Sequence, residues 1–515
     1  MLMGVGRSYC VALVGLNGYI VEVEADIGQT LPNFIILGLP DAALNEAKER
    51  IRSAARNSGI PLSRRKITAN LIPASLPKRG SGFDLAITMA VLRAADDIRE
   101  IGGTVFIAEL GLDGRLRPVR GILPAVMAAV QAGYPDIVVA EANAAEASLV
   151  PGAKVRGYKT LARLAFDFGA DPKDLALDYD PLDVDEPGED SDDALIVPDL
   201  CDVSGQGEAR RALEVAAAGG HHMLLTGPPG AGKTMLAERL PGLLPDLADT
   251  AAMEVTAIHS LAAVQSSPVR LLRRPPFENP HHSATAAAIV GGGSGLPRPG
   301  AASRAHRGVL FLDEAPEYER RVLDALRQPL ESGELVIHRS AGTAAYPARF
   351  QLVLAANPCP CGKASGKGMD CTCTAMMRRR YFGRISGPLL DRVDIQLQVE
   401  RVSLADFGHA GEEEDTHTVA ERVLAARQRQ LERLLAMGLE TNSQVPGRTL
   451  RGELRLSPGT TRILDTALER GTLTARGYDR VLRLAWTLAD LGHCDAPDID
   501  HIGQALGLRQ AAAAT

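Results

Sequence analysis

The sequence predicts a multidomain α/β protein with a mostly helical C-terminal part. A length of 515 residues exceeds one ordinary domain, and domains of roughly 100–200 residues predict about three. Short apolar runs alternate with helical patterns through the first 400 residues or so, and the periodicity then becomes helical. A glycine-rich loop at residues 227–234 directly follows a short apolar run, as phosphate-binding loops of α/β proteins do.

The composition is ordinary for a globular chain, with 45% hydrophobic and 23% charged residues. No stretch of about 18 residues is uninterruptedly apolar, so we expect no membrane span. Residues 1–14 lack a basic flank and a long apolar run, so we expect no signal peptide and a cytoplasmic protein.

One acidic segment accounts for the net charge of −7 and divides the chain. Residues 171–193 hold eleven acidic residues, one lysine and several prolines. Such a self-repelling stretch predicts a linker, which we place at residues 171–197. It separates an N-terminal domain (1–170) from an ATPase domain (198–400), and a helical C-terminal domain (401–515) follows. Because the acidity is local, it does not argue against a nucleic-acid partner.

Strands and helices are predicted in each of these domains. In the N-terminal domain we expect strands at residues 10–13, 19–23, 34–37, 103–109 and 137–139, and helices at 42–58 and 83–94. In the ATPase domain we expect a helix at residues 207–218 and buried parallel strands at 223–226, 309–312 and 351–356. In the C-terminal domain we expect helices at residues 419–437, 457–470, 475–491 and 498–507.

A phosphate-binding loop follows the predicted strand at residues 223–226. Its eight positions are Gly227, Pro228, Pro229, Gly230, Ala231, Gly232, Lys233 and Thr234. A loop without bulky side chains can turn its backbone N–H groups toward a polyphosphate, and the following helix N-terminus adds partial positive charge. Lys233 would reach the β- and γ-phosphates, and the Thr234 hydroxyl would bind Mg²⁺. The pattern predicts binding of ATP with Mg²⁺, and a chance glycine–proline turn is the alternative.

Polar residues end the next two buried strands. Asp313 and Glu314 follow the first, and Asn357 follows the second. Asp313 would hold Mg²⁺, and Glu314 would act as general base on the attacking water. The Asn357 amide would orient that water beside the γ-phosphate. Ordinary strand ends and a turn before Pro358 are the alternatives, but in combination with the loop these residues predict ATP hydrolysis rather than binding alone.

Four of the seven cysteines form two close pairs, Cys359 with Cys361 and Cys371 with Cys373. Two such pairs can supply four tetrahedral thiolates, which favours a structural Zn²⁺, and reduced free thiols are the alternative. Four thiolates leave no open position for catalysis by the metal. The remaining cysteines are expected to be buried apolar residues, namely Cys10, Cys201 and Cys494.

An arginine ends a helix-like segment at residues 387–394. ATPases that work as rings need a cation from the neighbouring subunit to stabilise transition-state charge, and Arg392 is our candidate. Four upstream arginines could do the same, could bind phosphate backbone or could form a solvated basic face, namely Arg378, Arg379, Arg380 and Arg384.

These residues resemble the YifB/ComM family of magnesium-chelatase-like AAA+ ATPases over nearly the whole chain. Besides the motifs above, the resemblance rests on residues 19–24, 38–41, 64–76, 80–84, 205–206, 211–219, 280–283, 291–293, 305–314, 357–362, 387–394 and 475–491. One departure is the sequence at residues 300–304, where the family usually has an acidic run. That departure puts an inter-subunit or insert contact in doubt and leaves the hydrolytic residues unaffected.

The resemblance implies a layout and further site residues. The N-terminal domain is similar to the Lon-protease-like, ribosomal-S5-type fold, and the centre looks like a AAA+ α/β/α module of the helix-2-insert class with its insert near residues 283–300. The C-terminal helices look like the lid, and Arg476 matches the sensor-2 arginine that contacts the γ-phosphate. Gly205 and Gln206 would lie near the adenine. A hairpin formed by residues 334–342 would point into the ring pore, where Arg339 would contact DNA, and an exposed turn arginine is the alternative.

Lon-like domains can carry a Ser–Lys dyad that cleaves peptide bonds. Gly82 stands where the serine should fall, although Ser81 is adjacent, and Leu123 stands where the lysine should be. We therefore expect a non-proteolytic domain that serves DNA interaction or ring assembly.

The motifs and the resemblance are compatible with two functions of different classes. The first is a homo-hexameric ATP-driven motor, a DNA helicase or branch-migration factor for recombination or transformation intermediates, since family members related to ComM are such helicases. The second is a chaperone-like remodelling ATPase related to the magnesium chelatase motor subunit. That subunit lacks this N-terminal domain and this cysteine cluster, which favours the DNA motor.

Overall fold

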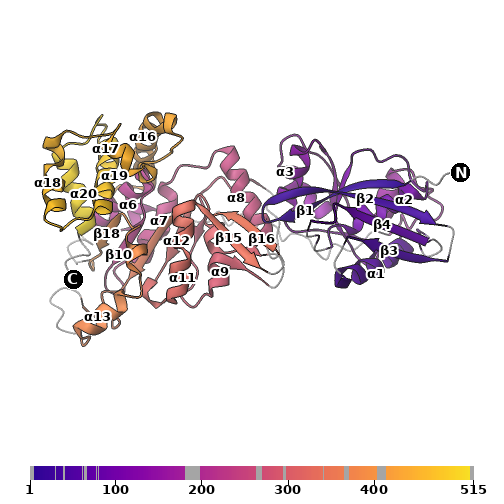
Figure 1. The fold of residues 1–515 in the computed structure, drawn as a ribbon, viewed down its shortest axis with the longest axis horizontal. Helices are drawn as coiled ribbons and strands as arrows, with labels where there is room; N and C mark the ends of the chain where they lie inside the picture. Colours follow the sequence, from indigo (N-terminus) through magenta and orange to yellow (C-terminus); the bar gives the residue numbers. More distant parts are fainter. Residues whose placement is uncertain are drawn as a thin grey trace.

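The computed structural model describes residues 5–510 except 29–30, 39–40, 61, 63–65, 77, 79–80, 180–197, 263–269, 294–296, 340–341, 365–370 and 403–412. The chain forms an elongated molecule with an N-terminal α/β unit at one end and helices at the other (Figure 1). Mixed α/β units followed by helices are the predicted architecture. No helix among the described residues is long and apolar enough to cross a membrane.

The N-terminal unit is a seven-stranded mixed sheet in the order β3-β4-β2-β1-β5-β8-β9. Its strands are β1 (Gly6–Val14), β2 (Asn17–Gly28), β3 (Asn33–Leu37), β4 (Lys66–Ile72), β5 (Val105–Ile107), β8 (Asp136–Ala140) and β9 (Lys154–Tyr158), and β6 (Glu109–Leu110) and β7 (Leu116–Arg117) form a separate short pair. The helices are α1 (Asp41–Asn57), α2 (Asp84–Ala94), α3 (Ile122–Gln131), α4 (Glu141–Ala147) and α5 (Leu161–Asp167).

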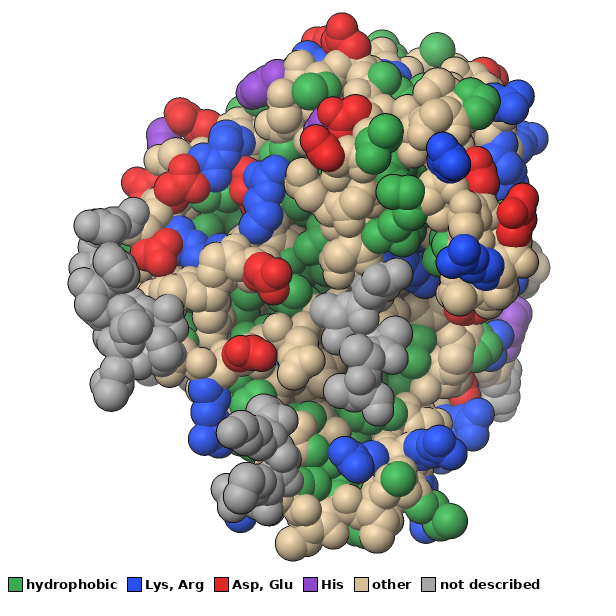
Figure 2. Space-filling model, turned by 90° about the vertical axis from the view of Figure 1, so that its left-hand side faces the viewer, with side chains coloured by type: hydrophobic (Ala, Val, Ile, Leu, Met, Phe, Trp, Pro, Cys, Tyr) green, Lys and Arg blue, Asp and Glu red, His purple; other side chains and the backbone are tan. Residues whose placement is uncertain are grey.

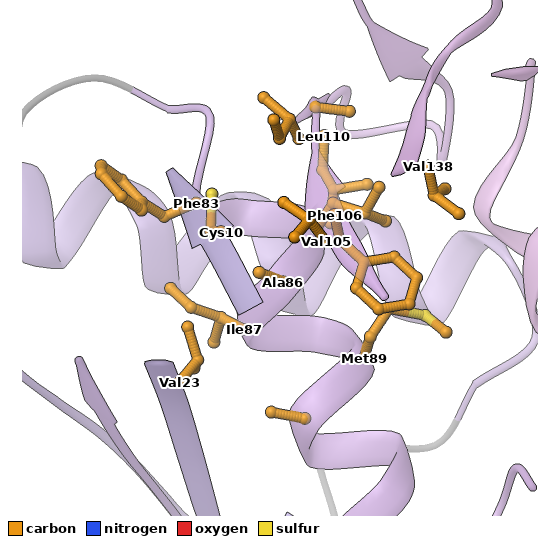
Figure 3. Packing of buried hydrophobic residues seen from close by; sticks show 14 of the residues in the cluster. Cys10, Val23, Phe83, Ala86, Ile87, Met89, Val105, Phe106, Leu110 and Val138 are labelled. Atoms are coloured by element: carbon orange, nitrogen blue, oxygen red, sulfur yellow. The ribbon is translucent and has the colours of Figure 1, made fainter. Parts of the chain in front are cut away.

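Helix α2 is the centre of this unit's core. Ten of its eleven residues are buried, because it packs against β1, β2 and β5. Figure 3 shows its side chains Ala86, Ile87 and Met89 among residues of the sheet, including Phe106. Such burial explains why this helix shows a continuous apolar sequence rather than one apolar stripe.

The predicted linker begins against this unit. The backbone N–H of Ala176 donates to the Ser58 carbonyl at 3.2 Å, and Tyr179 donates to Asp113 at 3.1 Å. Leu175 packs on the apolar core. Residues 171–179 are therefore part of the folded surface, and the rest of the predicted linker, 180–197, lies outside the described residues.

The central unit is a five-stranded parallel sheet in the order β11-β14-β17-β10-β18. Its strands are β11 (Phe277–Glu278), β14 (Val309–Leu312), β17 (Gln351–Ala356), β10 (Met223–Thr226) and β18 (Ile395–Gln398), and its helices are α6 (Gly207–Gly219), α7 (Lys233–Leu243), α8 (Asp249–Ala262), α9 (Ala286–Val290), α10 (Ala301–Arg304), α11 (Arg320–Ala325), α12 (Arg327–Ser332), α13 (Ala375–Phe382) and α14 (Gly387–Leu390). Strands β10, β14 and β17 are fully buried, as their continuous apolar runs predict.

Two small hairpins project from this unit. One pairs β12 (Gly291–Gly292) with β13 (Arg298–Pro299), and the other pairs β15 (Glu334–Arg339) with β16 (Gly342–Pro347). The first lies in the interval where the insert was expected, and the second is the hairpin predicted at residues 334–342. The tip of the second, residues 340–341, lies outside the described residues.

The C-terminal part is helical. Its helices are α16 (Thr416–Leu434), α17 (Gly447–Arg451), α18 (Pro458–Glu469), α19 (Ala475–Leu491) and α20 (Ile499–Gln510). Helix α19 packs on α6 and α16, which joins this part to the apolar core beneath the central sheet. A buried network strengthens the junction, because Asp394 contacts His221 at 3.0 Å and Arg480 at 3.5 Å.

The N-terminal and central units meet through apolar contacts. Met253 of α8 is buried in the N-terminal core, and α3 packs on α8. Leu16, in the turn between β1 and β2, packs on the hairpin residues Ile337 and Tyr346. The β15–β16 hairpin therefore rests on the N-terminal unit, a contact that sequence patterns did not indicate.

The three isolated cysteines differ in exposure. Cys10 is buried as predicted, whereas Cys494 is half-buried and Cys201 is exposed. The prediction for Cys201 is wrong because its short helical turn (Leu200–Asp202) buries Leu200 and leaves the neighbouring thiol at the surface.

Candidate nucleotide site and cysteine cluster

The glycine-rich loop joins β10 to α7 at the carboxyl edge of the parallel sheet. Gly230 and Gly232 have φ angles of +76° and +84°, a region that glycine adopts without strain. Helix α7 then begins at Lys233. Ligands of open α/β sheets bind at this edge, and a helix N-terminus favours anions. The loop therefore has the backbone form of a polyphosphate cradle.

Lys233 links the loop to the end of β17. Its ammonium group donates to the carbonyls of Gly227 and Pro228 at 2.8 and 3.0 Å and to Asn357 Oδ1 at 3.3 Å. Desolvation lowers the pKa of Lys233, and the nearby carboxylates of Asp313 and Glu314 oppose that shift. The sequence-predicted lysine and sensor amide thus lie in direct contact.

Thr234 and Asp313 form a second contact. The Thr234 hydroxyl donates to Asp313 Oδ2 at 2.7 Å, and Asp313 Oδ1 accepts from the Glu314 backbone N–H at 2.8 Å. A hydroxyl and a carboxylate are hard oxygen ligands, which suits Mg²⁺ held together with phosphate oxygens. The residues present therefore fit the predicted metal.

Glu314 lies at the edge of this group with a partner that sequence reasoning missed. Its φ of +50° is unusual for a residue with a side chain and marks local strain. Its Oε2 atom lies 3.2 Å from Nδ1 of His282, whose ring packs against the His281 ring in a tilted arrangement. The sequence did offer a signal for this contact, namely two adjacent histidines shortly after β11, the strand that pairs with β14.

Gly205 and Gln206 lie beside the loop from the other side. Gln206 donates to the Ala231 carbonyl at 2.7 Å, and the backbone N–H of Gly205 donates to Glu413 at 3.1 Å. Gln206 has a φ of +54° and directly precedes the first residue of α6. The pair therefore contacts the phosphate loop and the start of the C-terminal part, and its predicted adenine role stays a prediction.

Arg392 and Arg476 lie together but apart from the phosphate loop. Arg392 pairs with Glu331 of α12, and Arg476 lies 3.3 Å from Asp391. Desolvation and the neighbouring Arg327 and Arg476 lower the pKa of Arg392. Among the described residues, no hydrogen bond or ion pair joins this arginine cluster, defined as Arg327, Arg392 and Arg476, to the residues on the phosphate loop.

The four clustered cysteines come together in space. Cys359 Sγ lies 3.3 Å from that of Cys361 and 3.7 Å from that of Cys371, and all four ligand atoms lie within 4.8 Å of one another. A Zn–S bond of about 2.3 Å in a tetrahedron separates sulfurs by roughly 3.8 Å. A disulfide would need about 2.05 Å, so the arrangement suits a tetrahedral metal better than a disulfide. Cys373 completes the set, and the four sulfur ligands together fit Zn²⁺.

Arg339 is exposed at the end of β15, next to the glycine-rich β12 strand. This position keeps it available for a phosphate. In the N-terminal unit, Ser81 donates to Glu109 and the buried Lys78 donates to the Pro73 carbonyl. Leu123 is fully buried. No Ser–Lys hydrogen bond occurs among the residues described there.

Comparisons with known proteins give consistent matches. Models of the magnesium chelatase subunit ChlI match residues 199–407 and 23–143, and its C-terminal model matches residues 413–509. A Mycobacterium tuberculosis protein described as uncharacterised is 50% identical over 99% of this chain and 100% of its own length. The competence protein ComM of Haemophilus influenzae is 40% identical over 98% of both chains, and the Escherichia coli protein YifB, also described as uncharacterised, is 40% identical over 97% and 96%.

Proposed function

The chain belongs to the magnesium-chelatase-like family of AAA+ ATPases that includes ComM and YifB, and from this premise we propose that it is an ATP-driven ring motor acting on DNA. The observation that carries the hydrolytic half is the contact set of Lys233, Thr234, Asp313 and Asn357 at one sheet edge. The DNA half is supported by similarity to a competence protein over almost the full chain.

The chain's own residues divide the hydrolytic work. The loop amides and Lys233 bind the phosphates, and Thr234 with Asp313 holds Mg²⁺, which would neutralise charge on the transferred phosphoryl group. Glu314 accepts a proton from the attacking water while Asn357 orients that water. His282 positions the Glu314 carboxylate, because its ring nitrogen lies 3.2 Å from that carboxylate.

The arginine cluster supports a ring. Among the described residues, two of its three guanidinium groups form ion pairs, with Glu331 and Asp391, and no hydrogen bond or ion pair joins the cluster to its own phosphate loop. We assign Arg392 and Arg476 to the ATP bound by the neighbouring subunit, where a cation stabilises transition-state charge. A homo-hexamer is the assembly that we propose.

Three further assignments complete the proposal. The N-terminal unit is a non-proteolytic domain of the Lon-like, ribosomal-S5 type, and the central unit is a AAA+ module of the helix-2-insert class. The four cysteines hold one structural Zn²⁺. Arg339 contacts the phosphate backbone of DNA that passes through the ring, with the β15–β16 hairpin as its support.

The deciding experiment measures ATP hydrolysis by wild type and Glu314→Gln with and without single-stranded and four-way junction DNA. We expect DNA to stimulate the wild type and not the variant, and we expect the wild type to move junctions. If DNA leaves hydrolysis unchanged and junctions stay in place, the motor proposal is wrong while the ATPase assignment stands.

The alternative is a remodelling ATPase related to the magnesium chelatase motor. ChlI models match all three parts of the chain, and the match at residues 23–143 removes the expected lack of an N-terminal domain as an argument against this alternative. Such a protein would respond to a chelatase partner subunit rather than to DNA. Hydrolysis stimulated by that partner alone would replace our proposal with this one.

A further inference from the structure

The cysteine cluster lies between the nucleotide site and a short projecting helix, α13. Cys359 follows Asn357 by two residues, and Cys373 precedes the first residue of α13 by two. Thr374 caps that helix by accepting from the Met377 backbone N–H at 3.2 Å. Residues 357–364 therefore leave the sheet at the predicted sensor amide and carry the first cysteine pair, and residues 371–382 carry the second pair and continue as a helix.

The inner side of this segment rests on the catalytic residues. Gly362 has a φ of +74°, and a Cβ on it would lie 2.7 Å from Pro229 of the phosphate loop. Tyr381 of α13 is buried, with its hydroxyl beside the Asn357 backbone and near Glu314 and Cys359. The cysteine turn thus touches the phosphate loop, and the helix touches Asn357, the predicted sensor of the γ-phosphate.

The far end of α13 is fixed to the turn that follows Glu314. Arg384 donates to the Pro316 carbonyl at 3.0 Å and to the Glu317 carboxylate at 2.7 Å. Together with the cysteine cluster, this contact holds the helix at both ends. A displacement of α13 must therefore move Tyr381, the turn at residues 315–317 or the cysteines.

The outer side of α13 carries positive charge that no described residue pairs with. Arg378, Arg379 and Arg380 are exposed, and none forms an ion pair with another described residue. Helix α13 projects at the lower end of the molecule in Figure 1, and at the lower edge of Figure 2 Lys and Arg side chains gather with little Asp or Glu between them. Three adjacent guanidinium groups at an exposed site suit a polyanionic backbone.

We propose that α13 binds the phosphate backbone of single-stranded DNA and that the metal-filled cysteine cluster transmits this contact to Asn357, so that DNA accelerates hydrolysis through this segment. The proposal rests on the DNA motor function proposed above and names the surface that reads the DNA. The metal is essential because four cross-linked thiolates make a short, stiff joint, whereas free thiols would let the cysteine turn and α13 move separately. Tyr381 is a positioning residue in this scheme.

The test uses the full-length protein and a fluorescent single-stranded oligonucleotide. Changing Arg378, Arg379 and Arg380 to Glu should weaken binding at least tenfold at about 0.1 M salt. It should also reduce the slope of log Kd against log salt by about 2, since three phosphate contacts each contribute roughly 0.7. The charge-matched control changes three exposed arginines of the C-terminal part to Glu, namely Arg455, Arg462 and Arg470. We expect the control to keep the wild-type slope.

Two further variants test the transmission. Tyr381→Phe should keep DNA affinity within twofold while the ratio of DNA-stimulated to basal hydrolysis falls toward one. We expect elemental analysis to find one Zn²⁺ per chain in wild type, and the double variant Cys371→Ser/Cys373→Ser should lose this metal and the stimulation with it. Stimulation that survives either change would overturn the proposed relay.

The outcomes separate this proposal from the motor function. If wild type binds and responds to DNA but the triple variant matches its control, α13 is not the reading surface and the motor function stands. If wild type neither binds nor responds, the motor function fails and this inference falls with it. If the triple variant loses ring assembly in a mass measurement, α13 binds a second copy of the chain instead of DNA, and the inference is wrong.

Discussion

The phosphate-loop residues and the arginine cluster differ in how fully their charges are matched inside one chain. Around the loop, Lys233 meets two carbonyls and an amide, and Thr234 meets Asp313. In the arginine cluster, desolvation and, to a lesser degree, the neighbouring positive charges lower the pKa of Arg392. The first group has partners for its polar side chains within the chain, whereas the second places three guanidinium groups close together. If the proposed ring forms, the second group would complete the first across a subunit boundary.

The largest expected effect concerns the phosphate-loop side. Glu314→Gln removes the proton acceptor and keeps the shape of the side chain, so hydrolysis should fall about 10³-fold while ATP binding persists. Phosphate release and binding of a fluorescent ATP analogue measure the two properties. Glu319→Gln, an exposed acid nearby, is the matched control. Hydrolysis within tenfold of wild type would show that another group is the base.

The second effect tests whether the two groups act across subunits. Lys233→Ala and Arg392→Ala should each reduce hydrolysis about 10²-fold or more, because one removes phosphate binding and the other removes a transition-state cation. Mixed in equal amounts, the two inactive variants should regain activity, since some interfaces would pair an intact loop with an intact arginine. A mixture that stays as inactive as its components would place Arg392 at its own nucleotide.

A smaller effect is expected at the edge of the phosphate site. His282→Ala frees the Glu314 carboxylate from its partner, and we expect kcat to fall about tenfold because the base is less well placed. The KM for ATP should stay the same, since His282 does not contact the phosphate loop. His281→Ala is the control, and an equal loss there would mean that the histidine pair acts through packing.

The smallest effect concerns folding at the opposite edge of the same sheet. Burial lowers the pKa of His306 to about 4, and its Nδ1 accepts the Arg349 backbone N–H at 3.0 Å. The unfolded chain takes up this proton first, near pH 6.5, so the contribution is complete above that pH and is lost as pH falls toward 4. Urea unfolding at pH 7 and pH 5 should show a smaller pH difference for His306→Asn than for wild type.

Local sequence patterns predicted much of the central unit. The bounds of β10, β14, β17 and α19 are those expected, because continuous apolar runs and a strong 3.6-residue period leave little freedom. The loop, acid pair and asparagine were found because each ends a buried strand. In the N-terminal unit β4 and β9 were not predicted, since half-exposed strands with polar residues resemble loops in a single sequence.

Contacts between distant segments could not be predicted. His282 and Glu314 are brought together only by the pairing of β11 with β14, and Tyr381 reaches Asn357 only because the cysteines fold back. The arginine cluster likewise depends on where the C-terminal helices dock. Arg392 and Arg476 were predicted as site residues from separate motifs. Neither motif indicated that the two side chains are neighbours.

The interface between the N-terminal unit and the β15–β16 hairpin limits how the two can move. Gly15 is so close to Ala345 of β16 that a Cβ on it would lie 2.8 Å from that residue's carbonyl oxygen, and Leu16 packs on the same hairpin. Because of these contacts, the hairpin cannot shift while the N-terminal unit stays in place and the interface stays intact. If the hairpin moves, either the N-terminal unit moves with it or the apolar contact between the two breaks.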